Sequence, residues 1–447
     1  AWEYNLLNGG GSDNVYDQQR TNDLLDFYIT YDKYVESIKS QFVIMGGYSW
    51  QHFHRQQTST NSTIAHRPTD VQFSESFDDR TEYYLVSFYG RLNYTWGNRY
   101  MLTATIRDDG TSRFSEDNRW GLFPSVALGW KINEEGFLRD SRVISQLKLR
   151  LGWGITGQQA LEEGNDYPYL PRYTYSDPTA NYQFGDLFYQ TLRSEGYDAN
   201  IKWEETTTWN IALDYGFADD RYFGSIDFYI RNTDDLINFT PVPAGSNLTN
   251  YLLTNIGSME NRGFEFSIMT RPIVTEDWYW DIGFNFTYNE NEITKLTASD
   301  DPDYLGEPTG GISGGVGNNI QIHSVGHPIS SFFVLEQVYD ENGNPIEGLY
   351  VDRNGDGEIT DADKYHFNSP NAKFYFGLNS RLRYKNWDLA FSGRANFGNY
   401  VYNNVASENG VYERLYRPEG PYLSNIATYV NDTKFQSPRY MSDYYVQ

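Results

Sequence analysis

Alternating acidic and amide side chains between residues 352 and 363 give the clearest metal-binding pattern in this sequence. The stretch reads DRNGDGEITDAD and follows the calcium-loop pattern D-x-N-x-D-G-x-I-x-x-x-D. Flexible oxygen ligands at this spacing suit calcium better than magnesium, which needs a tight octahedron and keeps several of its waters. The candidate ligands are the side-chain oxygens of Asp352, Asn354, Asp356 and Asp363 and the main-chain carbonyl of Glu358.

Two features limit what such a loop could do. The twelfth position holds Asp instead of Glu, which shortens the last ligand, and no helical pattern flanks the loop. A switching pair of helices of the EF-hand type is therefore not expected. Bound calcium would stiffen the loop as a structural cofactor, and the alternative is an Asp-, Asn- and Gly-rich turn that binds no metal.

The rest of the sequence offers little that could do chemistry. It contains no cysteine, which removes disulfides, thiolate metal sites and cysteine nucleophiles. His52 and His54 would share one face of a strand, but without a third ligand we interpret them as residues at a strand end beside a loop. The glycine-rich stretch at 310–317 lacks the Lys-Ser/Thr pair of a phosphate-binding loop. We therefore predict that the protein is not an enzyme and has no catalytic residues.

The charge balance excludes one class of function. The chain has 447 residues, with 60 acidic and 35 basic side chains and a net charge of -25. Nucleic-acid binding depends on clustered Lys and Arg, and this sequence has no basic run. It also has no apolar run of about 18 residues, so any membrane role must be carried by strands.

Apolar and polar residues alternate in twelve segments, and this pattern predicts antiparallel strands. Between residues 281 and 289, for example, Ile282, Phe284, Phe286 and Tyr288 share one face and the residues between them share the other. The alternation alone also fits the two-layered core of a soluble sandwich. The segments lie near 24–34, 40–52, 83–95, 98–107, 123–132, 145–156, 205–217, 222–232, 263–273, 278–290, 372–384 and 387–398.

Three details favour a transmembrane barrel over a sandwich. The segments have about ten residues or more, enough to cross a bilayer at a tilt, whereas ordinary strands peak near five or six. Charged residues such as Arg150, Asp227 and Arg394 lie in mid-strand between apolar neighbours, which a water-filled lumen tolerates. Short connections alternate strictly with long ones, as periplasmic turns and extracellular loops do, and Tyr and Trp lie at strand ends. The long connections run near 53–82, 108–122, 157–204, 233–262 and 291–371.

The longest connection, 291–371, is ambiguous. If the short turns at 274–277 and 385–386 are both periplasmic, the strands that flank this connection rise and descend respectively. Residues 291–371 are then one extracellular excursion that carries the calcium-type loop, or they contain an even number of spanning strands. The apolar stretch 333–338 leaves this choice open.

Six stretches along the chain carry a more specific signal. They are RYMLTATIRDDGTSRF (99–114), GLFPSVALGW (121–130), LKLRLGWGITG (147–157), WEETTTWNIALDY (203–215), NIGSMENRGFEF (255–266) and DRNGDGEITDAD (352–363). In this order they resemble the barrel of SusC-like TonB-dependent transporters, the RagA/SusC type of Bacteroidota. The resemblance implies an all-β fold: an antiparallel transmembrane β-barrel in the outer membrane of a Gram-negative cell, with long extracellular loops and short periplasmic turns.

The same resemblance implies a function and partners. Proteins of this type import a large nutrient, an oligosaccharide or a peptide, with a SusD-like lipoprotein as a lid and with energy supplied by TonB through a plug region. Lipid of the outer membrane would surround the barrel. Such transporters carry a plug domain before a barrel of about 22 strands, and nothing in residues 1–447 resembles a plug or a TonB-binding segment. We therefore expect residues 1–447 to be a partial β-barrel domain, an internal fragment without the plug domain and the closing strands.

Two alternatives remain at this point. A siderophore or cobalamin receptor of the TonB-dependent class would need the same barrel, although the motifs from 99 to 157 weigh against it. A secreted, calcium-stabilised all-β protein that binds or cleaves glycans would pack its apolar faces against each other. The cargo is not predicted, because loop tyrosines suit sugar stacking and contact with a hydrophobic peptide alike; they include Tyr167, Tyr169, Tyr173 and Tyr175.

Overall fold

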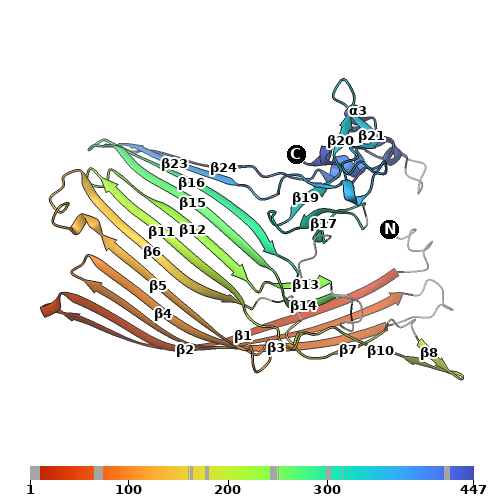
Figure 1. Cartoon of the computed structure of the whole chain (residues 1–447), viewed down its shortest axis with the longest axis horizontal. Coiled ribbons are helices and arrows are strands. Elements are labelled where there is room, and N and C mark those ends of the chain that lie inside the picture. Colours follow the sequence, from red (N-terminus) through yellow and green to blue (C-terminus); the bar gives the residue numbers. More distant parts are fainter. Residues whose placement is uncertain are drawn as a thin grey trace. The chain divides into compact units, whose positions relative to one another are not determined.

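The protein is built from long antiparallel strands. The computed structural model describes residues 11–64, 74–159, 161, 165–176, 181–241, 249, 251–297, 304–315, 317–416 and 423–447. In these residues twelve strands form one sheet and follow each other in chain order (Figure 1). They are β1 (Gly11–Val35), β2 (Ser40–Ile64), β3 (Ser74–Trp96), β4 (Tyr100–Thr111), β5 (Trp120–Lys131), β6 (Ile144–Gln158), β11 (Glu204–Phe217), β12 (Tyr222–Asp234), β15 (Ser258–Val274), β16 (Trp278–Lys295), β23 (Phe374–Tyr384) and β24 (Trp387–Phe397).

All twelve predicted strands are therefore confirmed, in the predicted order. By contact the chain divides into two compact units. The first contains residues 1–127, 154–205 and 235–255, and the second contains residues 128–153, 206–234 and 256–447. No helix in the described residues is long and apolar enough to cross a membrane.

In the first unit, β1, β2 and β3 are much longer than a bilayer crossing requires. They have 25, 25 and 23 residues, whereas about 9–11 tilted residues span the hydrocarbon. On one face of β2 every second residue from Phe42 to Trp50 is apolar or glycine. The next residue on that face, His52, lies 2.9 Å from a Glu82 oxygen and 3.8 Å from an Asp23 oxygen. This polar row marks the outer edge of the apolar band, and the strands continue beyond it.

The predicted loop at 53–82 was wrong for most of its length. β2 runs to Ile64 and β3 begins at Ser74, and His52 and His54 lie inside β2 and not at its end. The physical reason is composition: residues 56–63 are Gln, Thr, Ser and Asn, so neither face is apolar and no alternation reveals the strand. The backbone nevertheless pairs without interruption, because ladder hydrogen bonds do not depend on side-chain polarity.

In the second unit the cross-strand register gathers the apolar residues on one face. Phe284 of β16 lies opposite Ile268 of β15 and Leu378 of β23, whereas Asn285 lies opposite Ser267 and Gly377. Several apolar side chains are far more exposed than core residues, for instance Leu389 at 70% and Phe391 at 59%. The apolar face carries Ile226, Phe228, Phe264, Phe266, Ile268, Ile282, Phe284, Phe286, Phe376, Leu378, Leu389 and Phe391.

The opposite face of this unit is polar, and two of its arginines form ion pairs. Arg150 donates to Asp214 at 2.8 Å and to Asp227 at 3.0 Å. Arg381 donates to Asp388 at 2.7 Å. Pairing of this kind is what allows charged residues to sit in mid-strand among apolar neighbours.

The strand ends meet at tight turns flanked by aromatic side chains. Between β3 and β4, Gly97 and Asn98 both have positive φ, and the Arg99 N–H donates to the Trp96 carbonyl. Such a pair of left-handed residues is typical of a type I′ hairpin turn, which matches the twist of the strands. Trp96 stacks on Tyr100 with ring centroids 5.3 Å apart. Aromatic residues at strand ends are therefore confirmed.

The long connections contain small strands of their own. Hairpins form from β7 (Tyr173–Tyr175) with β10 (Leu192–Ser194), from β8 (Asn181–Phe184) with β9 (Leu187–Gln190) and from β13 (Ile237–Pro241) with β14 (Tyr251–Asn255). Short and long connections alternate as predicted, with one exception. The connection from β4 to β5 (112–119) should be a long one, but it is shorter than the next connection, from β5 to β6 (132–143).

The ambiguous stretch 333–338 does not cross the membrane. It contributes to two short strands, β19 (Ser331–Val334) and β20 (Gln337–Tyr339). β19 belongs to a four-stranded sheet with β17 (Glu307–Gly311), β18 (Asn319–His323) and β22 (Tyr365–His366), and β20 pairs with β21 (Pro345–Tyr350). The described part of 291–371 is thus a single excursion. In Figure 1 it lies at the end of β16 and β23 that is remote from the short turn between β23 and β24.

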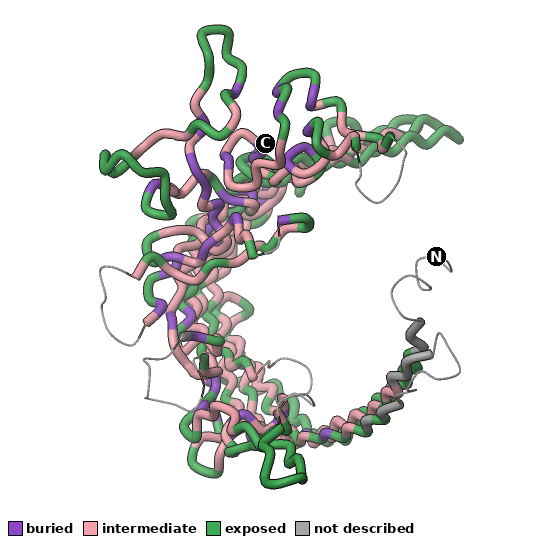
Figure 2. Tube along the Cα trace, turned by 90° about the vertical axis from the view of Figure 1, so that its right-hand side faces the viewer, coloured by how far each residue is buried: buried purple, intermediate pink, exposed green. Residues whose placement is uncertain are grey.

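The excursion packs with the residues that follow β24. We call the described residues of 304–371 and 399–447 the loop assembly. It includes the short helices α2 (Asn404–Asn409) and α3 (Val430–Thr433), and Figure 2 shows buried positions gathered near the C-terminus. The Leu335 N–H donates to the Met441 carbonyl, and the Asp443 N–H donates back to the Leu335 carbonyl. Its two hydrophobic clusters are formed by Ile320, Phe332, Val334 and Val446 and by Ala406, Val411, Phe435 and Tyr445.

The first prediction concerns the two faces of β16. Arginine at position 284 (Phe284→Arg) should lower the free energy of unfolding in a bilayer by about 2–4 kcal/mol, because it places a charge against lipid. Asn285→Arg, one residue along, places the same charge on the polar face and should cost much less. Denaturant titration of the full-length protein in lipid vesicles measures both, and equal losses at the two positions would contradict the assignment of faces.

Candidate functional site

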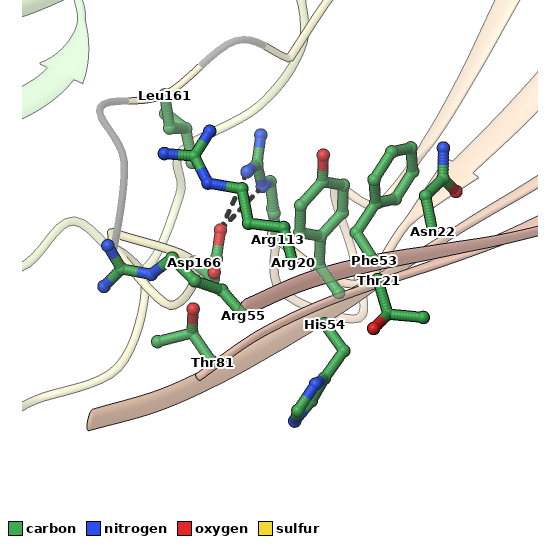
Figure 3. A pocket seen from close by; sticks show the side chains of 11 residues that line it. Arg20, Thr21, Asn22, Phe53, His54, Arg55, Thr81, Arg113, Leu161 and Asp166 are labelled. Carbon is green, nitrogen blue, oxygen red and sulfur yellow. Dashed lines mark hydrogen bonds and ion pairs between the residues drawn. The ribbon is translucent and has the colours of Figure 1, made fainter. Parts of the chain in front are cut away.

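A cavity of about 470 Å³ lies on the polar face of β1, β2 and β3, beyond the apolar band. Two cross-strand rows line it: Arg20, Arg55 and Thr81 are in register, and so are Asn22, Phe53 and Tyr83. Arg113, Leu161 and Asp166 complete the wall from the connections that follow β4 and β6. We call this cavity the arginine pocket. In Figure 3 its arginines and Phe53 stand on one side of the strands, whereas His54 points to the other side.

The wall of the arginine pocket is a stack of planar groups. The rings of Phe53 and Tyr83 are nearly parallel, with centroids 4.5 Å apart and an interplanar angle of 9°. The Arg113 guanidinium lies 3.6 Å from the Tyr83 ring centroid. Arg113 also donates to one oxygen of Asp166 from Nη2 at 2.8 Å and from Nε at 3.1 Å. Cation–π contact and a charge-assisted pair together fix the guanidinium.

The pocket is anchored on a hydrophobic cluster of the first unit. Phe114, Phe123, Ile201 and Trp203 form this cluster, and Leu161, which lines the pocket, packs against it. The Trp203 indole N–H donates to the Arg119 carbonyl at 3.0 Å. Phe114, the residue after Arg113, is therefore held in this hydrophobic cluster. The pocket wall cannot shift without disturbing the packing of the cluster.

Two features give the pocket its chemical character. Among the residues that the structure describes, three arginines and one carboxylate line it, although the whole chain is strongly acidic. Arg55 pairs with Asp79 at 2.5 Å, and Arg20 donates to the Gln18 side chain at 2.9 Å. The Thr81 hydroxyl is buried without a hydrogen-bond partner among the described residues, and the residue is 8% exposed.

The loop tyrosines that the sequence singled out have different environments. The Tyr167 hydroxyl donates to the Glu82 carbonyl at 2.7 Å, and burial raises the pKa of Tyr167, so this hydroxyl stays a donor at neutral pH. Tyr169 packs on the cluster of the first unit. Tyr173 and Tyr175 are 67% and 71% exposed on the hairpin that β7 forms with β10. Tyr167 and Tyr169 are half-buried and structural, whereas Tyr173 and Tyr175 are exposed and available for contact.

The calcium-type loop forms a compact turn. Asp352 accepts the N–H groups of Gly355 and Gly357 at 2.6 and 2.8 Å. Gly357 has a φ of 86°, which is the left-handed turn that the sixth position of such a loop requires. The Asn354 amide donates to Asp356 at 2.8 Å. The turn is thus held by hydrogen bonds within the loop itself.

Asp363, the twelfth residue, is placed differently from the other candidate ligands. It is buried and accepts N–H groups of Thr360 and Arg353, both at 2.8 Å. These backbone hydrogen bonds hold the pKa of Asp363 below its usual value, with the Thr360 N–H as the largest cause. In the described part of the chain no three acidic, His or Cys side chains group closely enough to hold a metal ion. Calcium binding, including the carbonyl of Glu358 as a ligand, stays a prediction.

The strands with these two features match a known family over nearly the whole chain. The family described as "TonB dependent receptor-like, beta-barrel" matches residues 2–429. The chain belongs to this family. It is 47% identical to the TonB-dependent receptor SusC of Bacteroides thetaiotaomicron over an alignment of 428 residues. This alignment covers 94% of this chain and 42% of that relative. It is 32% identical over 427 residues to a TonB-dependent receptor of Formosa agariphila, and that alignment covers 90% of this chain and 41% of the relative.

A solved structure supports the same fold. The structure titled "RagAB peptide importer in the 'open-open' state" superimposes with a TM-score of 0.77 at 20% identity, covering 98% of this chain and 47% of that one. The chain is thus a SusC/RagA-like β-barrel segment of a TonB-dependent receptor, located in the outer membrane. It spans about two-fifths of the length of the curated relatives it matches. Membership of this family contradicts the secreted alternative, and TonB-dependent receptors are transporters.

A stacked histidine pair in the loop assembly generates the second prediction. The rings of His327 and His366 are 3.5 Å apart between centroids, and the His366 Nδ1 is buried without a partner among the described residues. Burial, reinforced by His327, lowers the pKa of His366 from 6.5 to about 4. Burial likewise lowers the pKa of His327, against the charge of Glu292.

Because the folded state favours neutral His366, its stabilising contribution is present above pH 6.5 and is lost as the pH falls toward about 4. Hydrogen exchange in residues 319–334 should therefore accelerate between pH 6.5 and 4.5, after correction for intrinsic rates. His366→Phe keeps the stacked ring but cannot titrate, and it should flatten this dependence. An unchanged dependence in the variant would show that other groups control it.

Proposed function

We propose that this chain is part of a transporter that imports a large nutrient, an oligosaccharide or a peptide, across the outer membrane with energy from TonB. The observation that carries the proposal is the family match over residues 2–429 on a sheet with one apolar face and one polar face. One relative is named TonB-dependent receptor SusC, and the similar solved structure is titled a peptide importer. TonB would act through a plug region outside this chain.

The polar face would provide the surface along which cargo and water move. Some of its charges are fixed in pairs, such as Arg150 between Asp214 and Asp227, and fixed polar groups replace some of the hydration that a polar cargo loses. The arginine pocket lies on the polar face at the outer part of the strands and offers both planar and charged groups. We therefore assign it to the first contacts with the cargo. No covalent step is needed, because transport changes only where the cargo is.

The partner we propose is a SusD-like lipoprotein seated on the outer loops at 157–204, 233–262 and 291–371. Two features support this. The hydrophobic clusters of the loop assembly make it a firm surface. The hairpin of β8 and β9 exposes large apolar side chains, Tyr182 at 61% and Phe188 at 65% among them, and exposed apolar groups of this size commonly mark contact sites.

The third prediction tests import and partner together. Cells without the full-length transporter should lose uptake of large oligomers of the cargo and keep uptake of monomers. The transporter purified from native membranes should bring a lipoprotein with it, and a Tyr182→Ser, Phe188→Ser double variant should reduce the yield of that lipoprotein. Phe137→Ser, which changes a residue 73% exposed between β5 and β6, is the matched control.

Two results would count against this proposal. Loss of siderophore or cobalamin uptake, with oligomer uptake intact, would assign the chain to the alternative class of receptor. A transporter that imports the oligomers but always purifies alone would retain the import function and remove the lipoprotein from the proposal.

The calcium-type loop has a structural role in this proposal: calcium at Asp352, Asn354, Asp356, Glu358 and Asp363 would stiffen the outer surface. The loop is already fastened to its surroundings. Arg353 pairs with Glu336 at 2.5 Å, and its guanidinium lies 4.6 Å from the Tyr365 ring centroid. Calcium would therefore act locally on the turn and would not be needed for the fold of the loop assembly.

The fourth prediction follows. Calcium at about 0.1–1 mM, the range of extracellular calcium modules, should slow proteolysis within residues 352–363 of the full-length protein. Asp356→Asn should abolish this protection. Asp361→Asn is the matched control, since Asp361 belongs to the same loop, is 85% exposed and is not a predicted ligand. Equal proteolysis with and without calcium would identify the loop as a turn that binds no metal.

A further inference from the structure

We infer that the stacked pair of His327 and His366 is an acid-sensitive latch, which holds the loop assembly on the outer end of β16 and releases it when the pair takes up protons. The inference goes beyond the proposed import function and does not depend on the identity of the cargo. The stack and the contacts with β16 lie within the described ranges 251–297 and 317–416, both in the second unit. We call residues 324–329, which connect β18 to β19, the clasp.

The clasp is hydrogen-bonded to the edge of β16. The ladder between β16 and β23 ends before the outermost residues of β16, and there the clasp pairs with the same strand. The Gly326 N–H donates to the Ile293 carbonyl at 2.8 Å, and the Ile293 N–H donates to the His327 carbonyl at 3.0 Å. The Ile329 N–H donates to the side-chain oxygen of Asn291 at 2.9 Å. The clasp therefore fastens the loop assembly to a membrane-crossing strand.

The histidine stack fixes the clasp against the neighbouring strand β22. His366 of β22 lies opposite Phe333 of β19 in the four-stranded sheet. Its ring lies 3.5 Å from the His327 ring between centroids, at an interplanar angle of 9°, and 5.2 Å from the Phe333 ring. The position of the clasp thus depends on contact between two groups that can both become cations.

The closed stack disfavours protonation for two reasons. Two imidazolium rings at this distance repel each other. In addition, His366 Nδ1 is buried without a hydrogen-bond partner among the described residues, and both nitrogens of a protonated ring are donors, so one donor would lack an acceptor. Burial and His327 accordingly lower the pKa of His366 from 6.5 to about 4. In an open clasp water can reach the ring, and its pKa returns toward 6.5.

The nearest charge on β16 does not remove this cost. Glu292 acts on His327 and favours its protonated form, but burial has the larger effect, so the pKa of His327 remains below 6.5. A nearby histidine, His323 of β18, lies opposite Glu307 of β17, and burial lowers its pKa as well. Because His323 is not one of the two stacked rings, it provides a matched control for the latch.

The ionisable residues beside His366 in the chain are engaged with other partners. Lys364 pairs with Asp361 at 3.0 Å, and the Tyr365 hydroxyl donates to Asp443 at 2.6 Å. Opening of the clasp therefore remains the way in which His366 can take up a proton at low cost. Because the closed state favours neutral rings, its advantage is complete above pH 6.5 and is lost as the pH falls toward about 4.

Hydrogen exchange of the full-length transporter in detergent tests the inference. The Ile293 N–H points to the clasp, so its exchange reports opening of the clasp. Exchange of a peptide covering 290–296 should accelerate at least about ten-fold between pH 6.5 and 4.5, after correction for intrinsic rates. A peptide covering 281–288, where β16 pairs with β23, should show no such change and is the control within the same strand.

Three variants assign the effect to the stack. His366→Phe and His327→Phe each keep an aromatic ring and remove one of the two charges, so each should flatten the pH dependence of the 290–296 peptide. If one of these variants fails to fold, the other answers the question. His323→Phe should retain the dependence of the unmodified protein.

Three outcomes would overturn the inference and leave the import function untouched. Constant exchange of the 290–296 peptide down to pH 4.5 would show that the stack does not control the contact with β16. Equal acceleration of the 281–288 peptide would indicate general loss of stability of the strand. An unchanged pH dependence in both His366→Phe and His327→Phe would assign the effect to other groups. Failure of the import function would appear separately, as normal uptake of large oligomers in cells without the transporter.

Discussion

Backbone hydrogen bonding between neighbouring strands is the constraint on which the rest of this molecule depends. At the depth of a bilayer no water can satisfy an exposed N–H or C=O, so each strand must pair along its whole crossing length. Between neighbouring strands of the twelve-stranded sheet the ladders meet this requirement. β1 pairs with β2 from Gly11 opposite Ile64 to Val35 opposite Ser40 without a shift. Since side chains alternate with a period of two, one unshifted register assigns every residue of both strands to a face.

The same ladder explains how one protein can carry two unlike surfaces so close together. On β16, Phe284 and Asn285 are adjacent in sequence, yet their cross-strand neighbours are apolar and polar respectively. In β1 to β3 the paired strands extend beyond the apolar band. The 25 residues of β1, at about 3.3 Å each, would extend about 80 Å, whereas the hydrocarbon layer is about 30 Å thick. Beyond that band both faces are free to be polar, and it is there that the arginine pocket lies.

How much could be predicted from the sequence depends on whether a stretch of strand has one apolar face or two polar faces. Alternation reveals a strand wherever one face meets lipid, which is why all twelve strands were found. It fails where both faces are polar, as in residues 56–63, and the ends of β2 and β3 were misplaced there. The calcium-type loop was found because its candidate ligands are local in sequence. The arginine pocket was not, because Arg20, Arg55 and Arg113 come from separate strands and connections.

The sequence contains a weak signal for the pocket, but this signal is not sufficient by itself to predict the site. Arg113 is the last residue but one of the motif at 99–114, which the resemblance singled out as a stretch and not as a site. Its role depends on Asp166, 53 residues away, and on Tyr83, 30 residues before it. Only the pairing of β2 with β3 places Phe53 against that ring. The spacing of residues along the sequence can therefore reveal partners within one local turn. It cannot reveal partners that lie on separate strands and meet only through the register of the sheet.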